Sequence, residues 1–172
     1  KITNGITNST FTDNYVKIAS GTVYGGAIYT TTYLSINADN GTTLFSGNYT
    51  QVGTGEKDYN AIYVGSSSAT LKLNAVNNGV IQLNDNINGA SGYDVKITGD
   101  STGVVKLYND IKNADVITDN VTVDTANGQI HNYNFKTLTS NATTKYSIDI
   151  DLTNKTSDKF IVGGNSSGKI TI

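Results

Sequence analysis

Two aspartates near the C-terminus have the spacing that paired-carboxylate chemistry requires. Asp149 and Asp151 alternate within residues 147–152, and in a strand this places both side chains on one face, about 7 Å apart. Glycoside hydrolysis needs two carboxyl groups held roughly 5–9.5 Å apart. Asp85 and Asp110 are further candidates. An Asp-x-Asp run in a half-exposed strand is more often a solvated outer face, so we expect these carboxylates to be structural.

The sequence contains few of the residue types that other kinds of catalytic site need. His131 is the only histidine, it follows a predicted turn at residues 127–128, and there is no cysteine. All twelve basic residues are lysines and Glu56 is the only glutamate. A lyase acting on acidic polysaccharides needs a basic proton acceptor, often Arg, and Lys106 beside Asp110 is too generic a pair to indicate one. We therefore predict no catalytic residues and a protein that is not an enzyme.

Oxygen-rich loops at residues 84–86 and 115–120 are the only sequence features that suggest a metal. Neither matches the twelve-residue calcium loop or the glycine-rich nonapeptide repeat. No glycine-rich phosphate loop precedes a helix. We expect no resident metal and no cofactor, with weak calcium binding by these loops as an alternative.

The composition argues against disorder and against two classes of partner. Of 172 residues, 37% are hydrophobic and 15% are charged, and Asn, Thr, Ser and Gly fill the difference from an average chain. β-Branched and aromatic residues recur in short alternating runs, which is typical of strands. A net charge of −2 gives no basic field for nucleic acid, and no apolar run approaches a membrane span. We expect neither nucleic-acid binding nor membrane insertion by this segment.

Short strands separated by Asn, Asp or Gly run through the whole chain. No window of ten residues supports an amphipathic helix, so we predict an all-β fold. Turn signals stand at residues 39–41, 77–79, 88–89 and 127–128. The predicted strands are residues 27–29, 34–37, 43–46, 61–64, 70–74, 80–84, 95–98, 104–108, 121–123, 134–138, 147–152, 159–162 and 169–172.

Internal similarity selects among the all-β architectures. Residues 34–38 align with 71–75, and in both cases a second short apolar run follows an Asn and Gly turn. Residues 27–29 are echoed at 61–63, and residues 79–83 at 103–107. Such repeats favour a solenoid, because each coil contacts only its neighbours and tolerates extra residues as loops. We predict a single-stranded right-handed parallel β-helix of roughly seven to nine coils, each about 20–24 residues long.

Turn asparagines offer a second sign of stacking. Asn37 and Asn74 occupy matching positions in the aligned repeats. In a stacked coil, such residues could hydrogen-bond to each other as a ladder. The alternative is that Asn is simply the turn residue of this composition.

A phrase near the N-terminus resembles a known family. Phe11-Thr12-Asp13-Asn14 is followed by Gly25-Gly26-Ala27-Ile28-Tyr29. This pair is similar to the Phe-x-x-Asn and Gly-Gly-Ala-Ile repeat of polymorphic outer-membrane proteins and related autotransporter passengers. The resemblance implies that Phe11 lies in the core, that Asn14 is a buried turn former and that Gly25-Gly26 is a bend packed against the next coil. Further stretches in the style of such passengers are residues 75–81, 84–87, 104–119, 133–135, 147–152 and 157–160.

The same resemblance implies a biological setting. The chain is expected to be a segment of a larger polypeptide exported through the outer membrane and displayed on a bacterial cell surface. Residues 1–172 are expected to form a single β-helix domain, with residues 133–172 as a less regular C-terminal part. The expected function is structural and adhesive. Two alternatives are a self-assembling extracellular fibre subunit and a β-helical polysaccharide-active enzyme.

Tyrosines provide the predicted contact surface. Eleven are present, and they are concentrated in the first third of a chain that lacks Trp. Tyrosine is enriched at recognition surfaces, although it also fills the rim between coils. The polar segment at residues 53–59 is expected to protrude. Expected partners are a protein or glycan of a host or bacterial surface, with self-association as a further possibility. The predicted contact residues are Tyr24, Tyr29, Tyr33, Glu56, Lys57 and Tyr59.

Overall fold

The computed structural model describes residues 5–141 and 143–168, and these residues form strands and turns with no helix. None of them therefore forms a helix that could span a bilayer. The predicted all-β class is confirmed. The largest sheet contains, in spatial order, β1 (Ile6–Thr7), β5 (Leu34–Asp39), β9 (Thr70–Val76), β12 (Tyr93–Gly99), β14 (Ala114–Asp119), β17 (Thr137–Ser140) and β22 (Ser166–Gly168).

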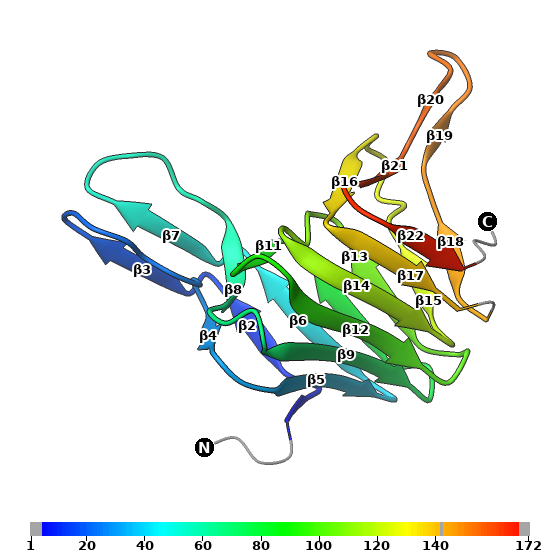
Figure 1. Cartoon of the computed structure of the whole chain (residues 1–172), viewed down its shortest axis with the longest axis horizontal. Coiled ribbons are helices and arrows are strands. Elements are labelled where there is room, and N and C mark those ends of the chain that lie inside the picture. The colour runs from blue at the N-terminus through cyan, green and yellow to red at the C-terminus, as the bar shows by residue number, and fades with distance from the viewer. Residues whose placement is uncertain (1–4, 142, 169–172) are drawn as a thin grey trace.

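Two further sheets accompany the largest one along the molecule (Figure 1). The six-stranded sheet contains β18 (Lys145–Ser147), β15 (Thr122–Asp124), β13 (Val104–Leu107), β10 (Val80–Leu83), β6 (Thr42–Ser46) and β2 (Thr10–Thr12). The three-stranded sheet contains β11 (Asn86–Gly89), β8 (Asn60–Val64) and β4 (Ile28–Thr30). The two-stranded sheets pair β3 (Tyr15–Ile18) with β7 (Tyr49–Val52), β16 (Asn132–Phe135) with β21 (Lys159–Val162), and β19 (Ile150–Asp151) with β20 (Thr156–Ser157).

All strand pairs are parallel except β19–β20, which is antiparallel. Apart from β19 and β20, consecutive strands of the chain lie in different sheets, and each pairs with its counterpart one repeat away. We call the chain from one strand of the seven-stranded sheet to the next a repeat. The observed register confirms all three sequence alignments. Residues 34–38 pair with 71–75, 80–83 with 104–107, and 28–29 with 62–63. These stacked parallel strands are consistent with a solenoid.

The repeats vary in length more than predicted. The register partners Ile6, Ile36, Leu73, Ile97, Thr118, Ser140 and Gly168 lie on successive strands, so the repeats contain 30, 37, 24, 21, 22 and 28 residues. Only the three central repeats approach the expected 20–24 residues. The extra residues leave the stack as excursions, which neighbour-only pairing permits.

Two excursions account for the longer repeats (Figure 1). At the N-terminal end, β3, β7 and the loops after them extend away from the sheets; we call residues 15–23 and 49–59 the arm. At the C-terminal end the β19–β20 hairpin protrudes, and Leu152 at its tip is 85% exposed. Of these excursions, only the protruding loop at residues 53–59 of the arm was predicted from the sequence.

The core is a set of inward-facing columns. Ile36, Leu73 and Ile97 are register neighbours with at most 1% exposure, and they form an aliphatic column. The column becomes polar toward the C-terminus, where Thr118 takes the next position and its hydroxyl lies 2.9 Å from the Tyr146 hydroxyl. At this position the core thus changes from an apolar contact to a buried hydrogen bond along the stack.

Turns between the first two sheets use left-handed asparagines. Asn40, Asn77, Asn78 and Asn120 have φ between 45° and 62°, a conformation that Asn adopts more readily than most residues. Gly79 follows such a turn, and a Cβ there would overlap the Ala38 carbonyl. The predicted turns at residues 39–41 and 77–79 thus place the chain tightly against the preceding repeat.

Several sequence expectations were wrong in detail. Residues 88–89 end strand β11 rather than forming a turn, and Gly89 is needed there because a Cβ would lie 2.5 Å from the Val64 carbonyl oxygen. The run 134–138 is divided between β16 and β17, and 147–152 is interrupted between β18 and β19. The strand predicted at 169–172 lies outside the described residues.

The expectations drawn from the family resemblance fared unevenly. Phe11 is partly buried and packs on the core. Gly25 and Gly26 are buried, and a Cβ at Gly26 would lie 2.5 Å from the Tyr49 backbone nitrogen, so the bend packs against the next repeat as expected. Asn14 is exposed rather than buried, because its neighbour one repeat on, Asn48, occupies the buried position.

Candidate functional site

Tyrosine side chains gather on the outer face of the three-stranded sheet. Tyr29 on β4 and Tyr63 on β8 are register partners, and their rings stack with centroids 6.0 Å apart. Tyr24, from the loop before β4, lies 4.3 Å from the Tyr63 ring and 5.7 Å from the Tyr29 ring. We call Tyr24, Tyr29 and Tyr63 the tyrosine cluster. Tyr24 and Tyr29 are 42% and 54% exposed, so ring surface remains open to a partner.

A glycine makes room for this cluster. A Cβ at Gly65 would lie 2.5 Å from the Tyr29 hydroxyl, so the phenol rests directly over the backbone of the following repeat. Burial raises the pKa of Tyr63, and the charges of Tyr24 and Tyr29 add to the shift. A phenol hydroxyl can both donate and accept a hydrogen bond.

The arm carries a second group of aromatic residues. Tyr15 and Tyr49 stack with centroids 5.2 Å apart and an interplanar angle of 8°. Tyr59 contacts Tyr49 at 6.1 Å, and the Lys57 ammonium lies 4.2 Å from the Tyr49 ring centroid. Such a cation–π contact orders an otherwise solvated lysine. Glu56 is exposed on the same loop.

The structure divides the predicted contact residues between two places. Tyr24 and Tyr29 belong to the tyrosine cluster, whereas Lys57 and Tyr59 contact Tyr49 in the arm. Tyr33 precedes β5 and is 63% exposed. Residues 54–59 are all exposed, which confirms that the loop protrudes. That these residues bind a partner stays a prediction.

The carboxylate of Asp85 is committed to holding the stack together. It is 2% exposed and accepts hydrogen bonds from the Gly47 and Asn48 backbone nitrogens, each at 2.9 Å, and from Asn48 Nδ2 at 2.7 Å. Asn48 Oδ1 in turn accepts from Asn14 Nδ2 at 2.8 Å. A side-chain ladder therefore runs through three repeats at this bend. The ladder considered at Asn37 and Asn74 is not formed, since these two side chains bond elsewhere.

Asp149 and Asp151 do not share one face of a strand. Asp149 lies between β18 and β19, and its Oδ2 accepts from the backbone nitrogens of residues 127–129 at 2.7–3.2 Å. Asp151 accepts from the Thr153 and Asn154 nitrogens and thereby caps the hairpin turn. These bonds, chiefly from the Asn154 backbone, lower the pKa of Asp151. Both carboxylates serve turns in this structure.

Asp110 and His131 form a pair across one repeat. His131 Nε2 lies 3.2 Å from Asp110 Oδ1, and the ring meets Tyr133 edge-on at 4.6 Å. The sequence placed His131 only after a turn, and its pairing with Asp110 could not be predicted because 20 residues separate the two. Burial, followed by the charge of Asp158 and two other aspartates, raises the pKa of the Tyr133 phenol.

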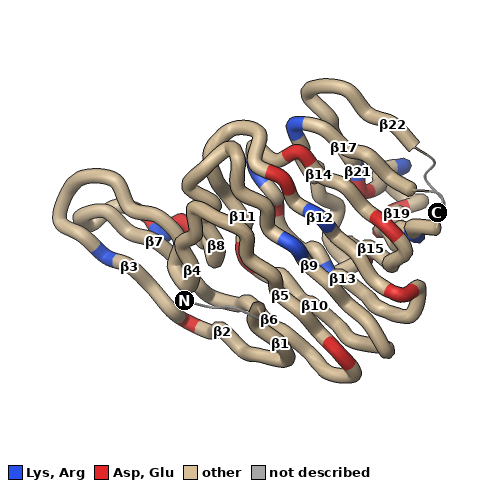
Figure 2. The backbone as a smooth tube through the Cα atoms, turned by 60° about the horizontal axis from the view of Figure 1, so that its bottom comes forward, with Lys and Arg blue, Asp and Glu red and all other residues tan. Residues whose placement is uncertain are grey.

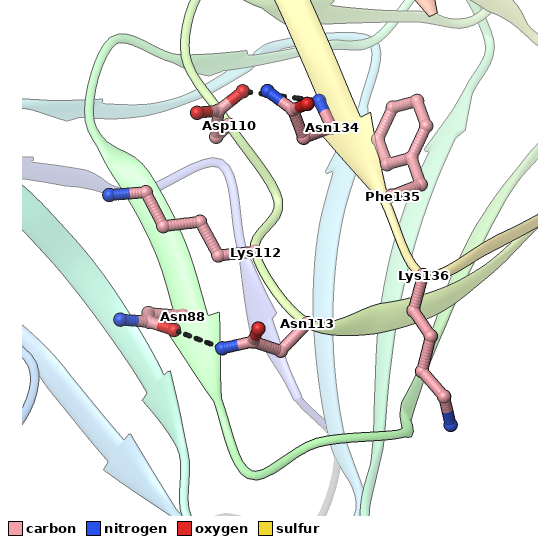
Figure 3. A pocket seen from close by; sticks show the side chains of 7 residues that line it. All are labelled: Asn88, Asp110, Lys112, Asn113, Asn134, Phe135 and Lys136. Atoms are coloured by element: carbon pink, nitrogen blue, oxygen red, sulfur yellow. Dashed lines mark hydrogen bonds between the residues drawn. The ribbon is translucent and has the colours of Figure 1, made fainter. Parts of the chain in front are cut away.

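A shallow depression opens beside this pair, with a volume of about 410 Å³ (Figure 3). It lies where the outer face loses its regular ladder. Residue Ile111 contacts β11 through a single bridge to Ile87, and β16 pairs with β21 instead of with this segment. The residues that line it are Asn88, Asp110, Lys112, Asn113, Asn134, Phe135 and Lys136.

Charges of both signs are interspersed along the molecule (Figure 2). Lys136 Nζ pairs with Asp115 at 3.3 Å near the depression. Within residues 5–141 and 143–168, no group of three or more His, Asp or Glu side chains is placed to hold a metal ion. The oxygen-rich loops instead use their carboxylates for internal bonds, as Asp85 does with Asn48.

The depression was missed by sequence reasoning, because its residues come from three repeats and carry no motif. The one available signal was the irregular run between the predicted strands at 104–108 and 121–123. Comparisons with protein-family models, with curated proteins and with solved structures found no match in any of the three.

Proposed function

We propose that the chain is a right-handed parallel β-helix whose function is display and adhesion on a bacterial cell surface. The in-register parallel pairing of strands one repeat apart supports the coil, since it is the arrangement a solenoid requires. The closed right-handed winding, the passenger identity and the export through the outer membrane belong to this proposal.

The observation that carries the adhesive role is the exposed tyrosine cluster beside a protruding arm. In solenoids, insertions gather on one face, and that face is often the binding face. Here the two longest consecutive repeats contribute the arm, and Tyr29 on the adjoining sheet is 54% exposed. Exposed aromatic side chains supply large contact area at low entropic cost.

The proposed adhesive role can be measured with coated beads on an epithelial monolayer. Beads carrying the wild-type chain should adhere above uncoated beads. The double variant Tyr29→Ser, Tyr59→Ser should reduce adherence about tenfold, since buried aromatic anchors dominate interfaces. Tyr108→Ser is the matched control, because Tyr108 is partly buried and lies outside both the cluster and the arm. Equal adherence of the double variant and the control would remove the proposed contact surface.

The physical form of the purified chain separates display from fibre assembly. Electron microscopy should show discrete particles of single-chain size. Extended filaments would instead favour the self-assembling alternative, in which open strand edges template the next chain.

A further inference from the structure

The tyrosine cluster and the depression belong to one continuous face. Tyr29 pairs with Tyr63, and Tyr63 pairs with Asn88 on β11. Paired residues in parallel strands point to the same side of the sheet. Asn88 lines the depression, and its Oδ1 accepts a hydrogen bond from Asn113 Nδ2 at 3.2 Å. The outer face therefore passes from aromatic rings to amides along the stacking direction.

The depression retains unused hydrogen-bonding groups of both kinds. Asn113 and Asn134 use their amide nitrogens on Asn88 and on the Asn132 carbonyl oxygen. Among the described residues, the amide oxygens of Asn113 and Asn134 and the amide nitrogen of Asn88 have no partner. Two acceptors and a donor without partners thus belong to residues that line one open concavity. Sugar hydroxyls, which donate and accept at once, satisfy such a set.

The charged side chains in and near the depression differ in whether they have a hydrogen-bond or ion-pair partner. Asp110 accepts from the Asn134 backbone nitrogen and contacts His131, and Asp115 pairs with Lys136. The Lys112 ammonium has no hydrogen bond or ion pair with any described residue. In Figure 3 its side chain extends toward the strand that carries Asn88. Lys112 is thus the lysine of the lining that lacks a carboxylate partner, since Lys136 pairs with Asp115, and an ammonium without a partner can take an anionic group of a ligand.

The lining favours a glycan over a protein partner. No Val, Leu or Ile side chain lines the depression, and Phe135 is 7% exposed. Protein interfaces normally have an apolar core at their centre. Here the centre is polar, and the apolar surface lies at one end, where Tyr29 and Tyr63 can pack against the carbon–hydrogen face of a pyranose ring.

We propose that this face binds an acidic polysaccharide, lying along the stack, with a uronate carboxylate on Lys112 and a sugar ring against the tyrosine cluster. Neighbouring strands repeat at about 4.8 Å, which is close to the length of one pyranose residue. Successive sugars can therefore occupy successive repeats. The inference rests on the adhesive function proposed above and names the ligand class of that face.

The test uses oligomers of polygalacturonic acid and their fully methyl-esterified form, in which each carboxylate is replaced by a neutral methyl ester on the same sugar backbone. Isothermal titration calorimetry should detect binding of the acid form to the intact chain. The Kd should increase as the sodium chloride concentration is raised, because salt screens the attraction between the charges. Lys112→Gln should weaken binding roughly tenfold, because a charged hydrogen bond is lost. Tyr29→Ser should weaken it as well.

Lys96→Gln is the matched control, because it removes the same charge from an exposed lysine on β12, which lies in another sheet. Circular dichroism confirms that each variant folds. Equal binding of the acid and esterified oligomers, equal effects of Lys112→Gln and Lys96→Gln, or no binding of the acid form would each overturn the proposal. If beads still adhere through the tyrosines while the oligomers fail to bind, the ligand class is wrong and the adhesive function stands.

Discussion

The Asn48 amide donates a hydrogen bond of 2.7 Å to the Asp85 carboxylate, one repeat further along the stack. The same carboxylate accepts hydrogen bonds from two backbone nitrogens, so one buried side chain is the acceptor for three donors. Replacing Asp85 with alanine leaves these donors without partners in a buried place. We expect Asp85→Ala to lower the free energy of unfolding by about 3 kcal/mol, as measured by urea denaturation.

A surface aspartate provides the comparison for this prediction. Asp94 on β12 is half-exposed, so Asp94→Ala should change stability by about 0.5 kcal/mol or less. Equal urea midpoints for the two variants would mean that the Asn14–Asn48–Asp85 ladder contributes nothing to stability.

Phe11 and Phe45 stack between two neighbouring repeats, and their substitution measures how much this packing contributes to stability. Their rings are nearly parallel, with an interplanar angle of 3° and centroids 4.8 Å apart. Phe45 is fully buried and Phe11 only partly. We expect Phe45→Ala to cost about 3–5 kcal/mol and Phe11→Ala clearly less, measured by thermal unfolding. A larger loss at Phe11 would contradict the assigned burial.

Gly103 occupies a position where a side chain has no room. A Cβ there would overlap the Ala75 carbonyl of the preceding repeat. Gly103→Ala should therefore destabilise the protein by roughly 1–3 kcal/mol. Gly163→Ala is the control, because the nearest atom to its Cβ would be the Phe135 carbonyl oxygen at 3.9 Å. Similar melting temperatures for the two variants would show that the repeats are less closely packed at Gly103.

Asp100 predicts a local dependence on pH. Hydrogen bonds from the Asn77 backbone and then from the Thr102 hydroxyl lower its pKa below the usual 3.8. A carboxyl with a depressed folded pKa contributes stability above its unfolded pKa, and this contribution is lost as the pH falls through the folded pKa. A carbon-13 NMR titration should give a pKa below 3.8 for the Asp100 carboxyl, and the substitution Thr102→Ala should raise that pKa. A normal pKa in the wild-type chain would mean that these bonds do not form in solution.

The fold was predictable where the repeated phrases kept their spacing. Residues 34–38 and 71–75 alternate between apolar and polar side chains, so the repeated phrases gave the register as well as the strands. Strand β3 of the arm was missed because it is exposed on both faces and has no period of two. β14 was missed because its inward positions include a threonine, Thr118, which is buried but polar.

The site was predictable only in part. The clustering of tyrosines in the first third of the chain pointed to Tyr24 and Tyr29. The depression was not predictable, because Asn88 and Asn113 are brought together by a repeat length of about two dozen residues that varies along the chain. Side-chain partners one repeat apart, such as Asn48 and Asp85, cannot be recognised in the sequence when the repeat between them is 37 residues long.

The neighbour-only pairing of the strands has a mechanical consequence. Backbone hydrogen bonds of stacked parallel strands run along the stacking direction, so tension applied along that direction loads them one row at a time, as in opening a zip. The outermost repeat should yield first, at low force, while the rest stays folded. Each event would release 21 to 37 residues, or roughly 70 to 130 Å of extended chain. The molecule would thus lengthen in steps and absorb pulling energy without losing its remaining repeats.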